Sequence, residues 1–125
     1  MTPHLYLLTG ASRGMGLALA QQLLSAHHTL VCISRTESAE LAQQARQTGA
    51  TLLQWRHDLA DSGTLAAQLQ QWLQAQRDTP WRSATLINNA GMIPPISPLS
   101  QADADGLARA LRVGLEAPML LTATF

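Results

Sequence analysis

Three glycines in one short stretch carry the clearest chemical signal of this 125-residue chain. They lie in the segment Thr9-Gly10-Ala11-Ser12-Arg13-Gly14-Met15-Gly16. Gly10 permits a backbone conformation that a side chain would resist, and Gly14 leaves the backbone open to an approaching phosphate. Gly16 allows the next element to pack closely on its neighbours. If a helix starts here, its free N–H groups and the positive end of its dipole would favour an anion.

The segments before and after the glycines predict the strand and the helix that such an anion site requires. An apolar run predicts a strand over residues 4–9, and a leucine-rich run predicts a helix over residues 14–26. Glycine spacing alone is weak evidence, but a strand-turn-helix context favours the pyrophosphate-binding turn of a Rossmann unit. The alternative is a glycine-rich turn that binds no ligand.

A pair of arginines bears on the choice of dinucleotide. Residues 29–34 are apolar on both faces, which predicts a buried parallel strand, and Arg35 follows directly. At this point of a dinucleotide fold an acidic residue binds the adenosine ribose, whereas an arginine accommodates a 2′-phosphate. The chain has no acid here before Glu37, and Arg13 adds a second cation. These residues predict a preference for NADP(H); the alternative for Arg35 is a solvated loop arginine.

A second motif, Asn88-Asn89-Ala90-Gly91, ends an apolar run that predicts a strand over residues 84–88. With Thr9-Gly10-x-x-x-Gly14-x-Gly16 it makes the chain resemble the short-chain dehydrogenase/reductase family. The resemblance covers the whole chain, which is shorter than a usual family domain. It implies an α/β fold: a Rossmann-type, doubly wound parallel sheet of about four strands in the order 3-2-1-4, truncated. Residues 1–125 would then be the N-terminal part of an NAD(P)-binding domain.

The family resemblance also implies further cofactor contacts. An aspartate and the next residue, here Asp58 and Leu59, would contact the adenine ring, although Asp58 could simply begin a turn. The string after residue 88 would stabilise the sheet and line the cofactor, against the alternative of a plain Asn-Gly turn. The complete predicted cofactor set is Gly10, Ser12, Arg13, Gly14, Met15, Gly16, Arg35, Asp58, Leu59, Asn89, Ala90 and Gly91.

The remaining elements follow from periodicity and breakers. We expect a helix over 37–48, capped by Ser38 or Thr36 and stopped by Gly49. A strand over 51–57 and a helix from Asp61 or Ser62 to Arg77 come next, with an apolar stripe of Leu65, Leu69, Trp72 and Leu73. Residues 92–99 form a proline-rich loop, and a helix from Ser100 should kink near Gly114 and Pro118.

The catalytic groups of the family are not found in this chain. The resemblance implies a tyrosine whose pKa is lowered by a nearby lysine, with a serine and an asparagine. The one tyrosine is Tyr6, in the first predicted strand; all eight basic residues are arginines, and Gly114 stands at the position of the asparagine. We therefore assign no catalytic residue, and expect the serine, tyrosine and lysine beyond Phe125, in a chain that is a fragment or a truncated reading frame.

Two functional hypotheses follow. The first is the cofactor-binding half of an NADP(H)-dependent oxidoreductase that transfers hydride between nicotinamide and a carbonyl or alcohol. Segments 91–95 and 116–122 resemble the sepiapterin and benzil reductase branch of the family. The alternative is a catalytically inactive NADP(H)-binding module or a truncated remnant.

Composition limits the partners. Hydrophobic residues make up 46% and charged residues 13%, with a formal net charge of zero, so nothing favours nucleic acid or an acidic membrane surface. No third metal ligand stands at a suitable spacing from His27 and His28, so we predict no metal site. We expect the two histidines to interact with the dipole at the C-terminal end of the first helix. The single Cys32, and the absence of a signal-like start or membrane-length run, indicate a cytoplasmic protein.

The expected partner is a small carbonyl substrate of the full-length family. An exposed strand edge, together with Met119, Leu120, Leu121 and Phe125, invites association, which makes a homo-oligomer possible.

Overall fold

Four parallel strands form a single sheet in the computed structural model, which describes residues 3–125. The sheet order is β3-β2-β1-β4, as predicted, so the fourth strand returns to lie beside the first. In the register, Leu7 pairs with Val31 on one side and with Leu86 on the other. The strands are β1 (His4–Thr9), β2 (His28–Ser34), β3 (Thr51–Arg56) and β4 (Ser83–Ile87).

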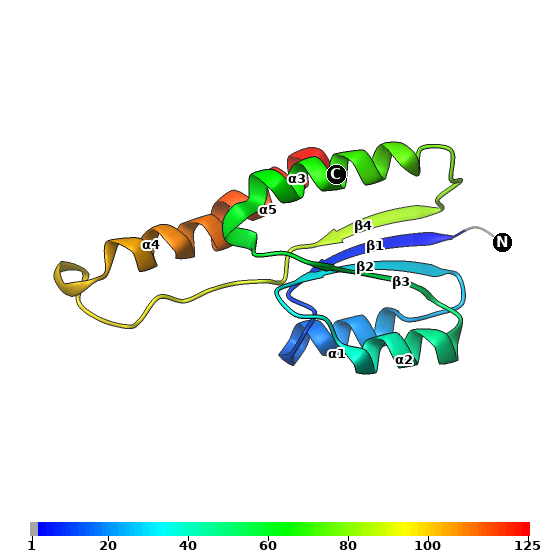
Figure 1. Ribbon diagram of the computed structural model, residues 1–125, viewed down its shortest axis with the longest axis horizontal. Helices are drawn as coiled ribbons and strands as arrows, with labels where there is room; N and C mark the ends of the chain where they lie inside the picture. Colours follow the sequence, from blue (N-terminus) through cyan, green and yellow to red (C-terminus); the bar gives the residue numbers. More distant parts are fainter. Residues whose placement is uncertain (1–2) are drawn as a thin grey trace.

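Helices cover both faces of this sheet (Figure 1). On one face lie α1 (Gly14–Leu23) and α2 (Ala39–Thr48); on the other lie α3 (Ser62–Ala75) and α5 (Ala117–Thr124). Helix α4 (Ala104–Leu111) extends beyond the end of the sheet. Two 3₁₀ turns, η1 (Leu59–Asp61) and η2 (Leu99–Gln101), and a π-helical turn, η3 (Arg112–Glu116), complete the elements.

Each face of the sheet has its own core because β1 and β2 are apolar on both sides. Leu8, Leu30 and Cys32 pack with α1 and α2. Leu5, Val31 and their neighbours pack with α3 and the last helix, and this cluster contains the predicted stripe of Leu65, Leu69, Trp72 and Leu73. The buried second strand is therefore confirmed.

The observed helix ends differ from the predictions by a few residues. Helix α2 begins at Ala39 rather than 37, because Ser38 is the cap: its Oγ accepts a hydrogen bond from Leu41 N at 3.2 Å. Gly49 ends this helix in a left-handed conformation, as predicted. The third helix ends at Ala75 rather than Arg77. Asp61 lies at its N-cap position but makes no side-chain cap.

The first helix ends at Leu23 rather than residue 26. His28 belongs to β2, and its Nδ1 lies 2.6 Å from the carbonyl oxygen of Leu23. One histidine of the adjacent pair therefore contacts the end of the helix, as expected.

The prediction for the last helix was wrong at its start. Ser100 lies in η2, and the helix begins only at Ala104, where Asp103 accepts a hydrogen bond from Gly106 N at 3.0 Å. Near Gly114, where we predicted a kink, the helix is interrupted by a π-helical turn, and Pro118 sits in the first turn of α5, where its missing N–H costs least.

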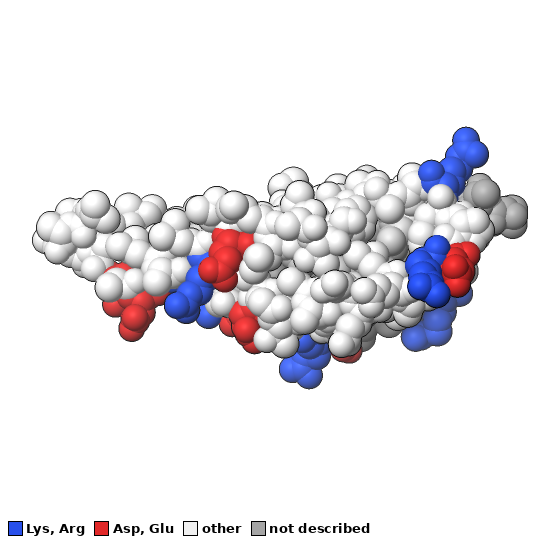
Figure 2. Space-filling model, turned by 90° about the horizontal axis from the view of Figure 1, so that it is seen from above, with Lys and Arg blue, Asp and Glu red and all other residues white. Residues whose placement is uncertain are grey.

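Three of the four residues of the predicted apolar patch are exposed: Met119, Leu120 and Phe125. Leu121 is fully buried, together with Ala117, because α5 packs beside α3 over the sheet. Leu111 and Leu115 are also exposed. The face of the molecule over α3 and α5 carries few charged side chains (Figure 2). Within residues 3–125 no helix is long and apolar enough for a membrane span.

Candidate cofactor site

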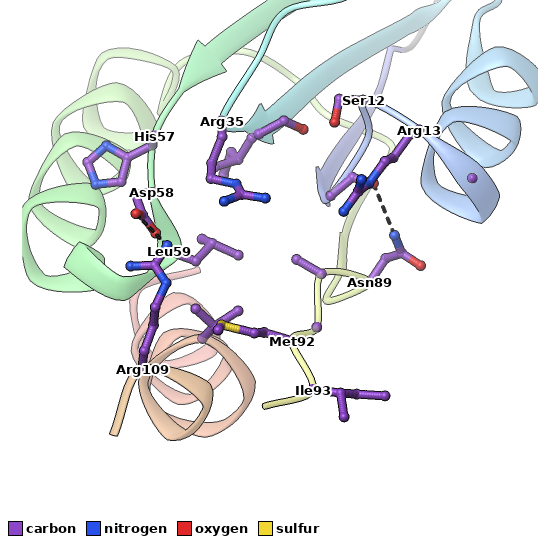
Figure 3. Close-up of a pocket in the computed structure, with 17 residues that line it drawn as sticks. Ser12, Arg13, Arg35, His57, Asp58, Leu59, Asn89, Met92, Ile93 and Arg109 are labelled. Atoms are coloured by element: carbon purple, nitrogen blue, oxygen red, sulfur yellow. Dashed lines mark hydrogen bonds and ion pairs between the residues drawn. The ribbon is translucent and has the colours of Figure 1, made fainter. Parts of the chain in front are cut away.

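A cavity of about 590 Å³ lies at the carboxyl ends of the strands, beside the point where the strand order reverses (Figure 3). Open α/β sheets bind their ligands at this position. Ten of the twelve predicted cofactor residues line the cavity. The two that do not are Met15, which is exposed, and Gly16.

The glycine turn has the shape that its sequence predicts. Gly10 and Gly14 have φ angles of +71° and +59°, in the left-handed region that favours glycine. A Cβ on Gly14 would meet no atom within 4 Å, so the backbone there is open. The N-cap residue of α1, Arg13, makes no side-chain cap, which leaves the first N–H groups of the helix to a ligand.

Gly16 acts in packing. A Cβ at this position would collide with the carbonyl oxygen of Gly10 and lie 2.6 Å from Asn89 Nδ2. The start of α1 therefore approaches both cavity loops as closely as the backbone allows. Contacts of Met15 and Gly16 with a cofactor stay predictions.

Two buried hydroxyl groups that the sequence analysis missed hold the cavity loops together. Thr9 Oγ1 accepts hydrogen bonds from the N–H groups of Asn89 and Ala90, both at 3.0 Å. Ser34 Oγ accepts one from Ala11 N at 2.9 Å. Asn89 Nδ2 also donates to the carbonyl oxygen of Gly10 at 3.2 Å. A hydroxyl residue at a strand end is too common in sequences to have signalled this role.

Charged groups gather along the cavity: three arginines and one aspartate line it. Asp58 Oδ2 accepts a hydrogen bond from Arg109 Nη2 at 2.7 Å, and its Oδ1 accepts one from Ala60 N at 3.0 Å (Figure 3). The bond from Ala60 and then that from Arg109 lower the pKa of Asp58, and the charge of Arg35 acts in the same direction. Asp58 is therefore a carboxylate at neutral pH.

Arg109 was not predicted as a site residue. It comes from α4 and stands 51 positions from Asp58 in the chain, so no spacing signal joins the two. His57, to which we assigned no role, also lines the cavity, and its Nε2 lies 2.8 Å from the carbonyl oxygen of Asp61. Met92, Ile93 and Val113 add apolar lining.

The tyrosine and the cysteine of the chain lie outside the cavity. Tyr6 lies in β1 with its ring centroid 5.0 Å from that of His28, and it does not line the cavity. Burial raises the pKa of the Cys32 thiol to about 12, so no thiolate forms at neutral pH. In the part of the chain that the structure describes, no three His, Cys, Asp or Glu side chains are grouped to hold a metal ion.

The strand order and the open glycine turn at the carboxyl edge define a Rossmann-type α/β protein. Residues 4–125 match the family model described as short chain dehydrogenase. The chain therefore belongs to the short-chain dehydrogenase family, and its sequence similarity places it in the benzil reductase-like branch.

Three relatives illustrate the match. A benzil reductase ((S)-benzoin forming) of Bacillus cereus is 34% identical over 119 residues, which are 95% of this chain and 48% of that enzyme. The crystal structure of a short-chain dehydrogenase/reductase from Burkholderia vietnamiensis is 33% identical, with a TM-score of 0.84, covering 99% of this chain and 56% of that one. A metagenomic short-chain oxidoreductase in complex with NADP is 28% identical, with a TM-score of 0.86, covering 99% of this chain and 55% of that one. The chain thus spans about half the length of these relatives.

Proposed function

We propose that residues 1–125 are the N-terminal part of an NAD(P)-binding domain and bind NADP(H) in the cavity at the carboxyl ends of the strands. The observation that carries the proposal is the pair Arg13 and Arg35, which border an open glycine turn. Within residues 3–125 neither arginine forms an ion pair, so both are available to a phosphate. NADP(H) differs from NAD(H) by the 2′-phosphate that two such cations would bind.

The other predicted contacts fit the same ligand. The N-terminus of α1 and the open backbone at Gly14 suit a pyrophosphate, and Asp58 supplies a carboxylate for the exocyclic amine of adenine. Ala90 and Gly91 are small and leave room near β4 for a ribose. When bound, the cofactor would supply or accept the hydride.

For the whole protein we propose hydride transfer between NADP(H) and a small carbonyl compound or alcohol. The names of the benzil reductase relatives support a carbonyl substrate. This chain would contribute cofactor binding, because its one tyrosine lies outside the cavity and it has no lysine. A cytoplasmic location agrees with the free, buried Cys32, and self-association with the exposed apolar residues of the last helix.

The test is a fluorescence titration of the purified chain with NADPH and, in parallel, with NADH. We expect saturable binding with tighter affinity for NADPH. Arg35→Ala should remove most of that preference, by about tenfold, since a charge-assisted hydrogen bond to phosphate contributes about 1.5–3 kcal/mol.

Arg46→Ala is the matched control. Arg46 is exposed in the last turn of α2 and outside the cavity, so the same change of side chain should leave the preference intact. Tighter binding of NADH by the unmodified chain would contradict the choice of cofactor. Binding of neither dinucleotide would favour an inactive remnant.

A further inference from the structure

The one acidic residue that lines the cavity is already paired, and its partner is unexpected. Asp58 is bound by Arg109 from α4, at 2.7 Å, and not by Arg35, whose charge nevertheless acts on it. The three guanidinium groups around the cavity are therefore not equivalent. Arg109 has a carboxylate partner, whereas Arg13 and Arg35 point into the space between the loops (Figure 3).

The contact matters because α4 has few other ties to the rest of the domain. No residue of α4 is buried, and the helix extends away from the sheet (Figure 1). Among residues 3–125, the bond from Arg109 to Asp58 is the side-chain hydrogen bond that joins α4 to the rest of the domain; the other, from Gly106 N to Asp103, lies at the start of α4 itself. Both side chains are partly exposed, 37% and 43%, so the pair contributes little to stability. What the pair changes is the charge of the cavity, because it neutralises the one acidic residue of the lining.

We propose that Arg109 is a positioning residue for cofactor choice: by holding Asp58 it keeps Arg35 free to bind the 2′-phosphate of NADP(H). This inference rests on the proposed function, since it concerns the same cavity. Besides Arg109, the cation whose charge acts on Asp58 is Arg35, and the two side chains line the same cavity. A carboxylate paired with Arg35 would compete with the phosphate for the same guanidinium and would repel it.

The ratio of NADPH to NADH affinity isolates this effect. Both dinucleotides carry the same adenine, so a change in the adenine contact of Asp58 affects both affinities alike and leaves the ratio unchanged. We expect Arg109→Ala to lower the preference for NADPH by up to about fivefold, the upper limit for one exposed ion pair. Arg109→Lys should retain most of it.

The decisive variant is the double change Arg109→Ala with Asp58→Asn. Asparagine keeps the hydrogen bond from Ala60 N but carries no charge, so Arg35 is free again and the preference should return. Asp58→Asn alone should leave the preference unchanged or raise it. Arg112→Ala is the matched control, because Arg112 is exposed next to α4 and does not line the cavity.

Two results would overturn the inference. One is an equal loss of both affinities in Arg109→Ala, which a merely structural role would produce. The other is a double variant that fails to regain the preference.

A ligand-free measurement separates this inference from the proposed function. In the ¹H–¹⁵N spectrum, the Nε–H signal of Arg35 should shift in Arg109→Ala and return in the double variant. If the unmodified chain binds neither dinucleotide but this signal behaves as described, the cofactor assignment fails while the pairing of charges holds. An Arg35 signal that does not move rejects the pairing itself.

Discussion

At the residue scale, Gly16 is the position where the cofactor turn tolerates least change. Its missing side chain allows the start of α1 to touch the carbonyl of Gly10 and the amide of Asn89, and these belong to the loops after β1 and β4. A side chain at this position would force the helix or one of the two loops to shift. Part of the glycine motif is thus a packing requirement of the fold.

We predict that Gly16→Ala lowers the free energy of unfolding by about 2 kcal/mol, because an added Cβ collides with backbone that cannot move freely. Urea unfolding followed by circular dichroism measures this quantity. The control is Gly63→Ala in α3, where a Cβ meets nothing within 4 Å and the helix gains propensity. If Gly16→Ala matched the control in stability, the close approach would be wrong.

At the scale of elements, the π-helical turn in the last helical segment keeps its flanking residues packed in the core. The π-helical turn η3 contains Gly114, and Val113 and Ala117 on either side remain buried against α3. Ser62 Oγ donates to Glu116 Oε1 at 3.0 Å, which ties the turn to the start of α3. The turn therefore carries the chain from the exposed α4 to the buried α5.

We predict that Gly114→Ala raises the free energy of unfolding by about 0.5–1 kcal/mol, because Gly114 is exposed in a helical segment and a Cβ there meets nothing. Ala123→Gly, at an exposed position of α5, should lower stability by a similar amount. Thermal and urea melts of both variants test the pair. A destabilising Gly114→Ala would mean that the π-helical turn needs a backbone that alanine resists.

At the scale of the whole molecule, charges are unevenly distributed. The face seen over α3 and α5 carries few charged side chains (Figure 2). In the C-terminal segment, Leu111, Leu115 and Met119 are 62%, 56% and 62% exposed. β4 is also an edge strand of the sheet. Exposed apolar surface of this kind marks a place of association.

We predict that the chain associates as its concentration rises, and that Leu115→Glu shifts the equilibrium toward the monomer by about tenfold or more. A charge buried in an apolar contact is costly, whereas it is well solvated on the free surface. Sedimentation velocity at several concentrations measures the equilibrium. Gln43→Glu adds the same charge on exposed α2 and should change nothing. A chain that stays monomeric throughout would refute the prediction.

Local patterns in the sequence were enough to predict the four strands, their order and most of the residues that line the cavity. Apolar runs and breakers are local signals, and the right-handed crossover rule converts them into an order that the sheet confirms. The glycine turn is equally local, because φ angles at Gly10 and Gly14 depend on those residues themselves. The family match over residues 4–125 agrees with the two motifs read from the chain.

The tertiary structure alone decided how distant side chains meet. Arg109 binds Asp58, 51 positions away in the sequence, and Thr9 binds Asn89, 80 positions away. No sequence spacing predicts contacts between residues so far apart. Leu121 is buried rather than exposed because α3, more than forty positions earlier in the chain, lies beside it. Backbone conformation follows from neighbours in the chain, whereas charge pairing and burial depend on neighbours in space, which only the packed fold supplies.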